Sequence, residues 1–133
     1  MAQKDRISLP AYLSAKASTA TFNGPWVHID GIDNVTFQAK WASGVHGVFG
    51  FDVSNDGPLT DSQTATPTGT LGASALTLPA SMTVAGATPS GSTAGSFMFE
   101  FNQMGEKWIR MNFTADGGGS SGAINCGVHG KAV

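Results

Sequence analysis

The chain has little charge, a single cysteine and no long apolar run, and each shortage removes a class of protein. Asp, Glu, Lys and Arg make up 12% of its 133 residues, about half of the usual share, which excludes a charged coiled coil. Lys and Arg form no run and the net charge is −2, so we expect no nucleic-acid binding through phosphates. The lone Cys126 cannot form an intrachain disulfide.

The apolar runs are also too short for a membrane span. No stretch approaches the roughly 20 residues of a spanning helix, and residues 1–12 lack the apolar region of a secretory signal. We therefore expect a protein made in soluble form in the cytoplasm, with no membrane partner. The length predicts one domain, residues 1–133, with a core that needs no disulfide.

What the chain does contain is alternation of apolar and polar residues, most clearly over residues 34–57. Successive side chains of a strand point to opposite faces, so each alternating run predicts a strand with one buried face. The short Ser43-Gly44 break between the two runs indicates that these strands pair as a hairpin. The expected inward residues are Val35, Phe37, Ala39 and Trp41, followed by Gly47, Phe49, Phe51 and Val53.

Similar runs separated by Gly-, Pro- and Asn-rich turns predict the remaining strands. About eight short strands and no long helix predict an all-β fold, a single antiparallel β-sandwich that is jelly-roll-like. A short helix over residues 11–17 is the alternative to part of the first strand, because Ala, Leu and Lys favour helix. Residues 1–10 are expected to form an N-terminal arm. The other expected strands lie within residues 7–21, 26–29, 71–84, 97–101, 108–114 and 123–131, and residues 59–70 and 85–95 are expected loops.

Two motifs resemble functional sites but lack the context those sites need. Residues 118–122 match G-x-S-x-G, yet a nucleophilic Ser requires a strand–turn–helix elbow with a His and an acid nearby. Residues 52–57 resemble the start of an EF-hand loop, yet the twelfth position is Gln63 instead of the bidentate Glu. Both segments are predicted to be turns.

The scattered ligand-type side chains predict neither a metal site nor a catalytic site. The three histidines, His28, His46 and His129, have no spacing typical of a metal site. Cys126 alternates with apolar residues and is expected to be buried and inert. We therefore expect no catalytic residue, no metal and no cofactor.

The aromatic residues Trp26, Trp41, Trp108 and Tyr12 are candidates for a sugar-stacking platform. Trp41 is in phase with Phe37 and is expected in the core. Trp108 is out of phase with Ile109, so it is expected either exposed or at a subunit contact, where Trp is enriched. We favour core or interface roles over sugar binding.

Two stretches resemble the small β-sandwich virion proteins of tailed bacteriophages, especially capsid cement or decoration proteins. One is residues 35–57, two strands around a small turn that end in Ser54-Asn55-Asp56. The other is residues 107–131, which resemble the closing hairpin of these proteins: the W-I-R-M-N-F-T segment precedes a Gly/Ser turn, a strand and a terminal G-K.

The resemblance implies a non-enzymatic structural protein on the capsid exterior. It would bind the major capsid protein and itself, as a homotrimer or homodimer, and hold the shell together. The alternatives are a phage tail, fibre or receptor-binding component, or a carbohydrate-binding module. The contacts are expected in the N-terminal arm, in the loop at 59–70 and at the outward Trp, with these residues as candidates: Ile7, Leu9, Leu59, Thr60, Thr66 and Trp108.

Overall fold

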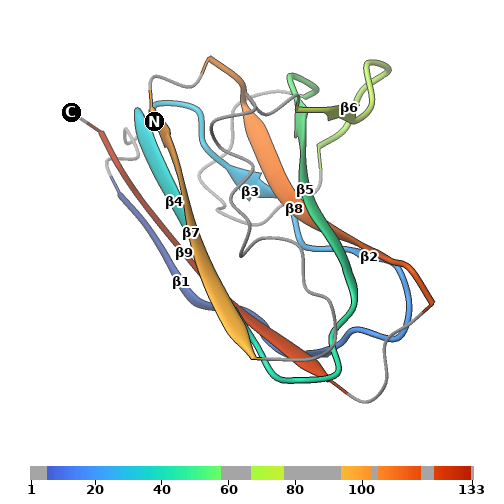
Figure 1. The fold of residues 1–133 in the computed structure, drawn as a ribbon. Coiled ribbons are helices and arrows are strands. Elements are labelled where there is room, and N and C mark those ends of the chain that lie inside the picture. Colours follow the sequence, from blue (N-terminus) through green and yellow to red (C-terminus); the bar gives the residue numbers. More distant parts are fainter. Residues whose placement is uncertain (1–5, 58–66, 77–93, 103–104, 118–121, 133) are drawn as a thin grey trace.

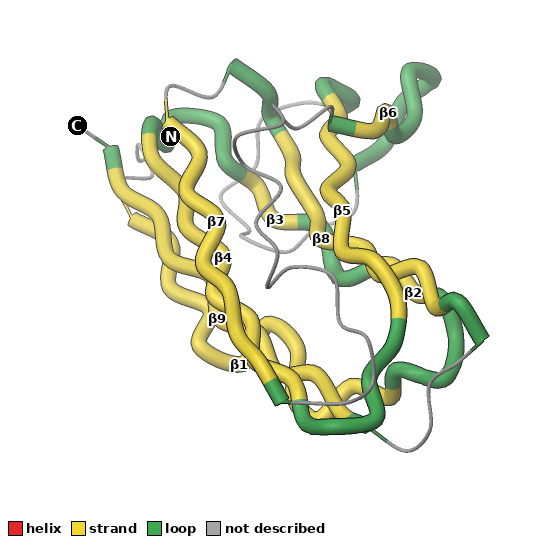
Figure 2. Tube along the Cα trace, viewed as in Figure 1, coloured by secondary structure: helices red, strands yellow, loops and turns green. Residues whose placement is uncertain are grey.

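The chain folds into two antiparallel sheets that pack face to face (Figures 1 and 2). The computed structural model describes residues 6–57, 67–76, 94–102, 105–117 and 122–132, and none of these residues is helical. The strands are β1 (Arg6–Ala17), β2 (Phe22–Asn23), β3 (Val27–His28), β4 (Asn34–Trp41), β5 (Gly47–Ser54), β6 (Ser74–Ala75), β7 (Gly95–Asn102), β8 (Trp108–Ala115) and β9 (Ala123–Lys131).

The strand order is that of a jelly roll. The first sheet, sheet A, has the order β1-β9-β4-β7, and the second, sheet B, has the order β2-β8-β5-β6, with β3 also paired to β8. When β2 and β3 are counted as one interrupted strand, the two sheets have four strands each, as in an eight-stranded jelly roll. The chain then passes from one sheet to the other at every connection except β5–β6. The predicted all-β, jelly-roll-like sandwich is therefore confirmed.

The predicted inward faces are also confirmed. In β4 the buried side chains are Val35, Phe37, Ala39 and Trp41, as the alternation requires. The same holds for the aromatic face of β7, for the predicted inward residues of β8, and for Ile124, Cys126 and Val128 of β9. The short-range period of two thus determined which side of β4, β7, β8 and β9 faces the core.

The predicted hairpin pairing over residues 34–57 is wrong. β4 pairs with β7 and β9 in sheet A, whereas β5 pairs with β8 and β6 in sheet B. The inward faces of β4 and β5 therefore meet across the core, where the ring centroids of Phe37 and Phe51 are 5.0 Å apart. The expected closing hairpin over residues 108–131 fails in the same way, because β8 and β9 also belong to different sheets. Alternation specifies a buried face, and either a hairpin or a crossover between sheets satisfies it.

The expected arm over residues 1–10 is wrong for residues 6–10, which belong to β1. Residues 6–9 pair regularly with β9, from Arg6 opposite Lys131 to Leu9 opposite Val128, and Ile7 is fully buried in the core. The helix alternative at residues 11–17 is replaced by the second half of β1. Residues 1–5 lie outside the described part of the chain.

Candidate interaction surface

Strand β1 forms one edge of sheet A and is irregular in its centre. The pairing with β9 slips between Leu9 and Leu13 and again between Leu13 and Lys16, so β1 carries extra residues at both places. At the second slip Ala15 has a φ of 48°, and its N–H donates to the Asn125 side chain at 2.8 Å. Such bulges twist an edge and interrupt its pairing pattern. The bulges therefore shape the surface around Pro10.

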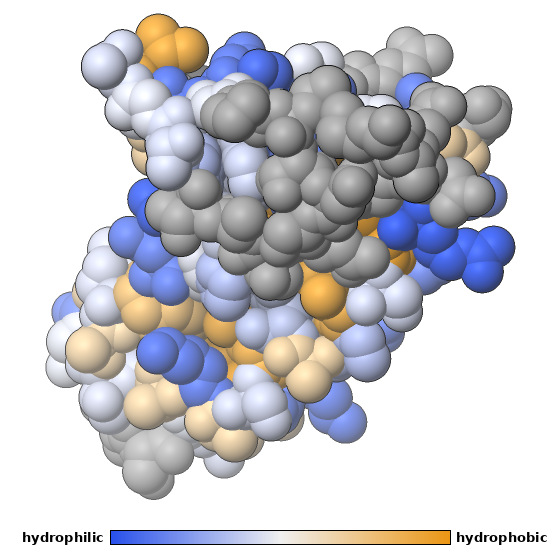
Figure 3. All heavy atoms as spheres, turned by 180° about the vertical axis from the view of Figure 1, so that it is seen from behind, coloured by the Kyte–Doolittle hydropathy of each residue, from blue (hydrophilic) through white to orange (hydrophobic). Residues whose placement is uncertain are grey.

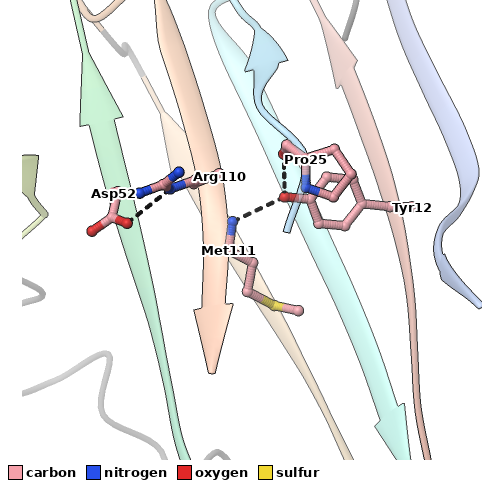
Figure 4. A network of polar contacts seen from close by, with 5 residues as sticks. All are labelled: Tyr12, Pro25, Asp52, Arg110 and Met111. Atoms are coloured by element: carbon pink, nitrogen blue, oxygen red, sulfur yellow. Dashed lines mark hydrogen bonds and ion pairs between the residues drawn. The ribbon is translucent and has the colours of Figure 1, made fainter. Parts of the chain in front are cut away.

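Tyr12 leaves the first bulge and crosses the sandwich to sheet B. Its ring packs edge-on against Phe37, with centroids 5.6 Å apart. Its hydroxyl donates to the carbonyl of Pro25 and accepts the N–H of Met111 at 3.1 Å (Figure 4). Pro25 lies in the break between β2 and β3, where the regular pairing with β8 is lost. The hydroxyl therefore bridges two backbone groups of the interrupted strand pair, and burial raises the pKa of this phenol well above its ordinary value.

A groove runs along the β1 edge where Tyr12 enters the core. It has a volume of about 510 Å³, and it is lined by Ser8, Leu9, Pro10, Ala11, Tyr12 and Pro25. Leu9 is half-buried and packs against the core from this edge. The lining is mostly apolar and contains two prolines, so the groove offers a rigid apolar surface at the side of the sandwich.

A shallow depression on the outer face of sheet A continues this groove. It has a volume of about 310 Å³ and shares Ser8 and Pro10 with the groove. Gly127 of β9 has no side chain to fill it, and Met98 of β7, 58% exposed, borders it. The groove and depression together are called the β1-edge surface below. Its remaining lining residues are Thr36, Gln38, Val128 and His129.

The molecule as a whole has few charged side chains at its surface. Seen from behind (Figure 3), pale and apolar residues reach the surface in the lower half of the molecule, with strongly hydrophilic ones scattered among them. This agrees with the charged content of 12%. A surface of this kind loses little hydration when a partner covers it, compared with one rich in Lys and Glu.

The structure separates the predicted contact residues. Leu9 lines the groove, whereas the side chains of Ile7 and Trp108 are buried at 0% and 2% exposure. The expectation that Ile7 and Trp108 make surface contacts is therefore wrong for this fold. Leu59, Thr60 and Thr66 lie outside the described residues.

Trp108 is buried on the outer side of sheet B, away from the main core. It points opposite to Ile109, as its phase predicted, but its ring lies 4.7 Å from the His28 ring. Its indole N–H donates to the carbonyl of Asp56 at 2.8 Å. The Asp56 carboxylate in turn accepts the N–H groups of Leu71 and Gly72, at 2.8 and 2.6 Å. Asp56 therefore connects the end of β5 to the segment at Leu71 and Gly72. Of the turn predicted over residues 52–57, residues 52–54 belong instead to β5.

Burial also removes most of the predicted sugar platform. Trp41 is in the core, as expected, and Trp108 is covered. Trp26 is half-buried, and the Arg110 guanidinium lies 4.4 Å from its ring centroid. Arg110 also pairs with Asp52 at 2.9 Å (Figure 4). Tyr12 is buried as well, so the partly covered Trp26 is what remains of the four candidates.

The ligand-type side chains do not converge in the described part of the chain. His46 pairs with Asp116 at the end of β8, His28 stacks on Trp108, and His129 lines the depression on sheet A. Within these residues no three His, Cys, Asp or Glu side chains gather as a metal site would require. Burial raises the pKa of the Cys126 thiol to about 12, which suppresses its thiolate. Most of the G-x-S-x-G segment, residues 118–121, lies outside the described residues.

The sequence did not identify the groove and depression as one surface. Their residues come from strands far apart in the sequence, and they meet because β1 and β9 are neighbours in sheet A. The usable signals were Pro10 within an alternating run, which is typical of an edge strand, and Gly127 within another, which marks a missing side chain.

Family models and curated proteins give no relative to set beside this surface. No protein-family model matches the chain, and no curated protein matches it significantly. Among the described residues no helix has the length and apolarity needed to cross a membrane.

Proposed function

We propose that this chain is a non-enzymatic structural protein of a phage virion, of the capsid cement or decoration type. It binds the outside of a shell of major capsid protein through the β1-edge surface. The observation that carries the proposal is that surface, an apolar groove continuous with a notched sheet face on a jelly roll of low charge. Because a fold does not specify a function, the proposal depends on this surface and on the sequence resemblance.

The physical role of such a protein follows from the thermodynamic linkage between its binding and shell assembly. A protein that binds the assembled shell and not the dispersed subunits stabilises the assembled state, by about 2.7 kcal/mol per occupied site when its free concentration is about 100 times its Kd. Many modest contacts repeated over a shell then add up. Self-association as a homotrimer or homodimer increases the number of simultaneous contacts, and with it the effective affinity.

The test is co-sedimentation of the purified chain with empty shells of the major capsid protein encoded in the same genome. We expect saturable binding at micromolar concentration and a higher temperature of shell disassembly in its presence. Bovine serum albumin at the same concentration serves as the control for trapped protein. Absence of saturable binding contradicts the proposal.

A glycan-binding role, as a tail or fibre component or a carbohydrate-binding module, is the competing candidate. Trp26 beside Arg110 and Asp52 is the observation that favours it, since an indole next to hydrogen-bonding side chains suits a sugar. A glycan array with the unchanged chain and Trp26→Ala separates the two. Binding that disappears in Trp26→Ala favours the glycan role, and no binding to any glycan removes it.

A further inference from the structure

We infer that the outer face of sheet A receives a partner protein surface that presents carboxylates around an apolar side chain. This inference rests on the proposed function and deepens it, because it names which face meets the shell and what chemistry that face requires. Two independent observations carry it: the sign of the charge on the face and an open notch that the fold does not need.

The outer face of sheet A is positive on a protein that is negative overall. The outward positions of its strands carry the cations Arg6, Lys40 and Lys131 and one carboxylate, Glu100. This makes the face net +2, counting His129 as neutral. The whole chain is −2, so the remaining residues carry −4. The face therefore attracts an acidic surface and repels a basic one.

The cations of this face are also poorly neutralised within the described residues. Arg6 lies directly opposite Lys131 across the β1–β9 pair, an arrangement that destabilises a sheet. The ion pairs recorded in the described part of the chain are His46–Asp116 and Arg110–Asp52, and neither involves this face. A partner carboxylate placed between Arg6 and Lys131 relieves this repulsion, which gives the acidic partner a specific point of contact.

The notch at Gly127 supplies the second observation. A Cβ added at this glycine would come no closer than 3.4 Å to any atom, the nearest being the Pro10 carbonyl oxygen. That is ordinary contact, so the fold has room for a Cβ here, and the backbone does not demand glycine. The missing side chain leaves a depression of about 310 Å³ edged by Met98, Pro10 and Val128. An apolar side chain of the partner fills it, as anchor residues fill pockets at interface centres.

The same features argue against other occupants. A second copy docked through the same face brings +2 against +2. A nucleic acid requires more cations than this face has. A sugar platform usually requires the ring of Trp, Tyr or Phe, and the outward positions of β9, β4 and β7 contain none of these three in the described residues. An acidic protein surface is the occupant that both the charge and the notch fit.

The charge is tested with a matched pair of variants in the shell-binding assay. Lys40→Gln and Thr114→Glu both change the net charge from −2 to −3, but Thr114 is exposed on β8 of sheet B. We expect Lys40→Gln to weaken binding about threefold, as an exposed ion pair allows, and Thr114→Glu to bind like the unchanged chain. Binding of the unchanged chain should also weaken as salt rises, because salt screens exposed charges.

The notch is tested with a second matched pair. Gly127→Val places a branched side chain at the depression, and Gly105→Val adds the same side chain at a glycine where an added Cβ would have nothing within 4 Å. We expect Gly127→Val to weaken shell binding at least about tenfold, and Gly105→Val to leave it unchanged. Circular dichroism and thermal unfolding of all four variants establish that each is folded before binding is compared.

The outcomes separate the two proposals. If the unchanged chain binds shells, and Lys40→Gln and Gly127→Val both weaken binding while their controls do not, the inference is supported. If the unchanged chain binds and either variant binds as tightly as its control, the inference is overturned, and the capsid-binding role stands without this face. If the unchanged chain does not bind shells, both are overturned.

Discussion

Removing the hydroxyl of Tyr12 should destabilise the fold, although the ring and its packing remain. In Tyr12→Phe the Met111 N–H loses its acceptor at 3.1 Å, and the Pro25 carbonyl loses its donor. Met111 is fully buried, whereas Pro25 is exposed, so water can replace the donor to Pro25 but reaches the Met111 N–H poorly. A buried donor without a partner costs about 1–3 kcal/mol, and we expect a loss of about 2 kcal/mol in the free energy of unfolding.

The loss is large enough to measure by thermal unfolding. Unfolding entropy near 60 °C is about 2.1 cal/mol/K per residue, which gives about 280 cal/mol/K for 133 residues. A loss of about 2 kcal/mol then lowers Tm by about 7 °C. Calorimetry of the unchanged chain and of Tyr12→Phe measures this difference directly.

The matched control removes a hydroxyl from the same strand without orphaning a backbone group. Ser14 of β1 is exposed, and Ser14→Ala should change Tm by less than about 2 °C, as surface substitutions usually do. If Tyr12→Phe lowers Tm by no more than Ser14→Ala does, the hydroxyl bridge does not stabilise the β2–β3 break, and the reasoning is refuted.

Buried groups lead to three further predictions. Tyr12 is the only tyrosine, and its pKa is raised in the folded state. Its contribution to the free energy of unfolding is therefore complete below the ordinary pKa near 10 and falls as pH rises above it. An ultraviolet titration should show tyrosinate appearing together with unfolding, and a native-state titration near 10 would contradict this. Cys126, with a pKa of about 12, should react with a disulfide reagent such as Ellman's reagent at neutral pH only after denaturant is added, and rapid reaction of the folded chain would show that the thiol is accessible. Asp56→Ala should lower the free energy of unfolding by about 2–3 kcal/mol, because two hydrogen bonds to a carboxylate are lost. Asp56→Asn should lower it by less, because the amide keeps one acceptor, and equal losses for the two variants in chemical denaturation would contradict this.

The failed hairpin predictions explain how far sequence reasoning reaches in this protein. For β4 and β5 the alternation identified the strands and their buried faces, but the short Gly44 turn was compatible with a hairpin and with a crossover. The choice depends on the other strands that compete for each edge. β4 lies between β7 and β9, which occupy both of its edges, so β5 pairs elsewhere.

The candidate surface was predictable only in fragments. Leu9 was expected at a contact and lies in the groove, but it was predicted on a free arm and belongs to a paired strand. Trp108 was placed on the correct side of β8 and is nevertheless buried, because Asp56 and His28 cover that side. Burial of an outward residue depends on what crosses over it, and local alternation carries no information on that.

Local pattern was sufficient for the class of fold and for the strands β4, β5, β7, β8 and β9 with their inward faces, because these depend on the period of neighbouring side chains. The assembled sandwich was needed to establish which strands pair, that the Tyr12 hydroxyl completes a strand pair in the opposite sheet, and that Pro10 and Gly127 share one surface. These features join residues far apart in the sequence, such as Tyr12 and Met111, which are 99 positions apart. They depend on long-range contacts, which form only when both sheets come together.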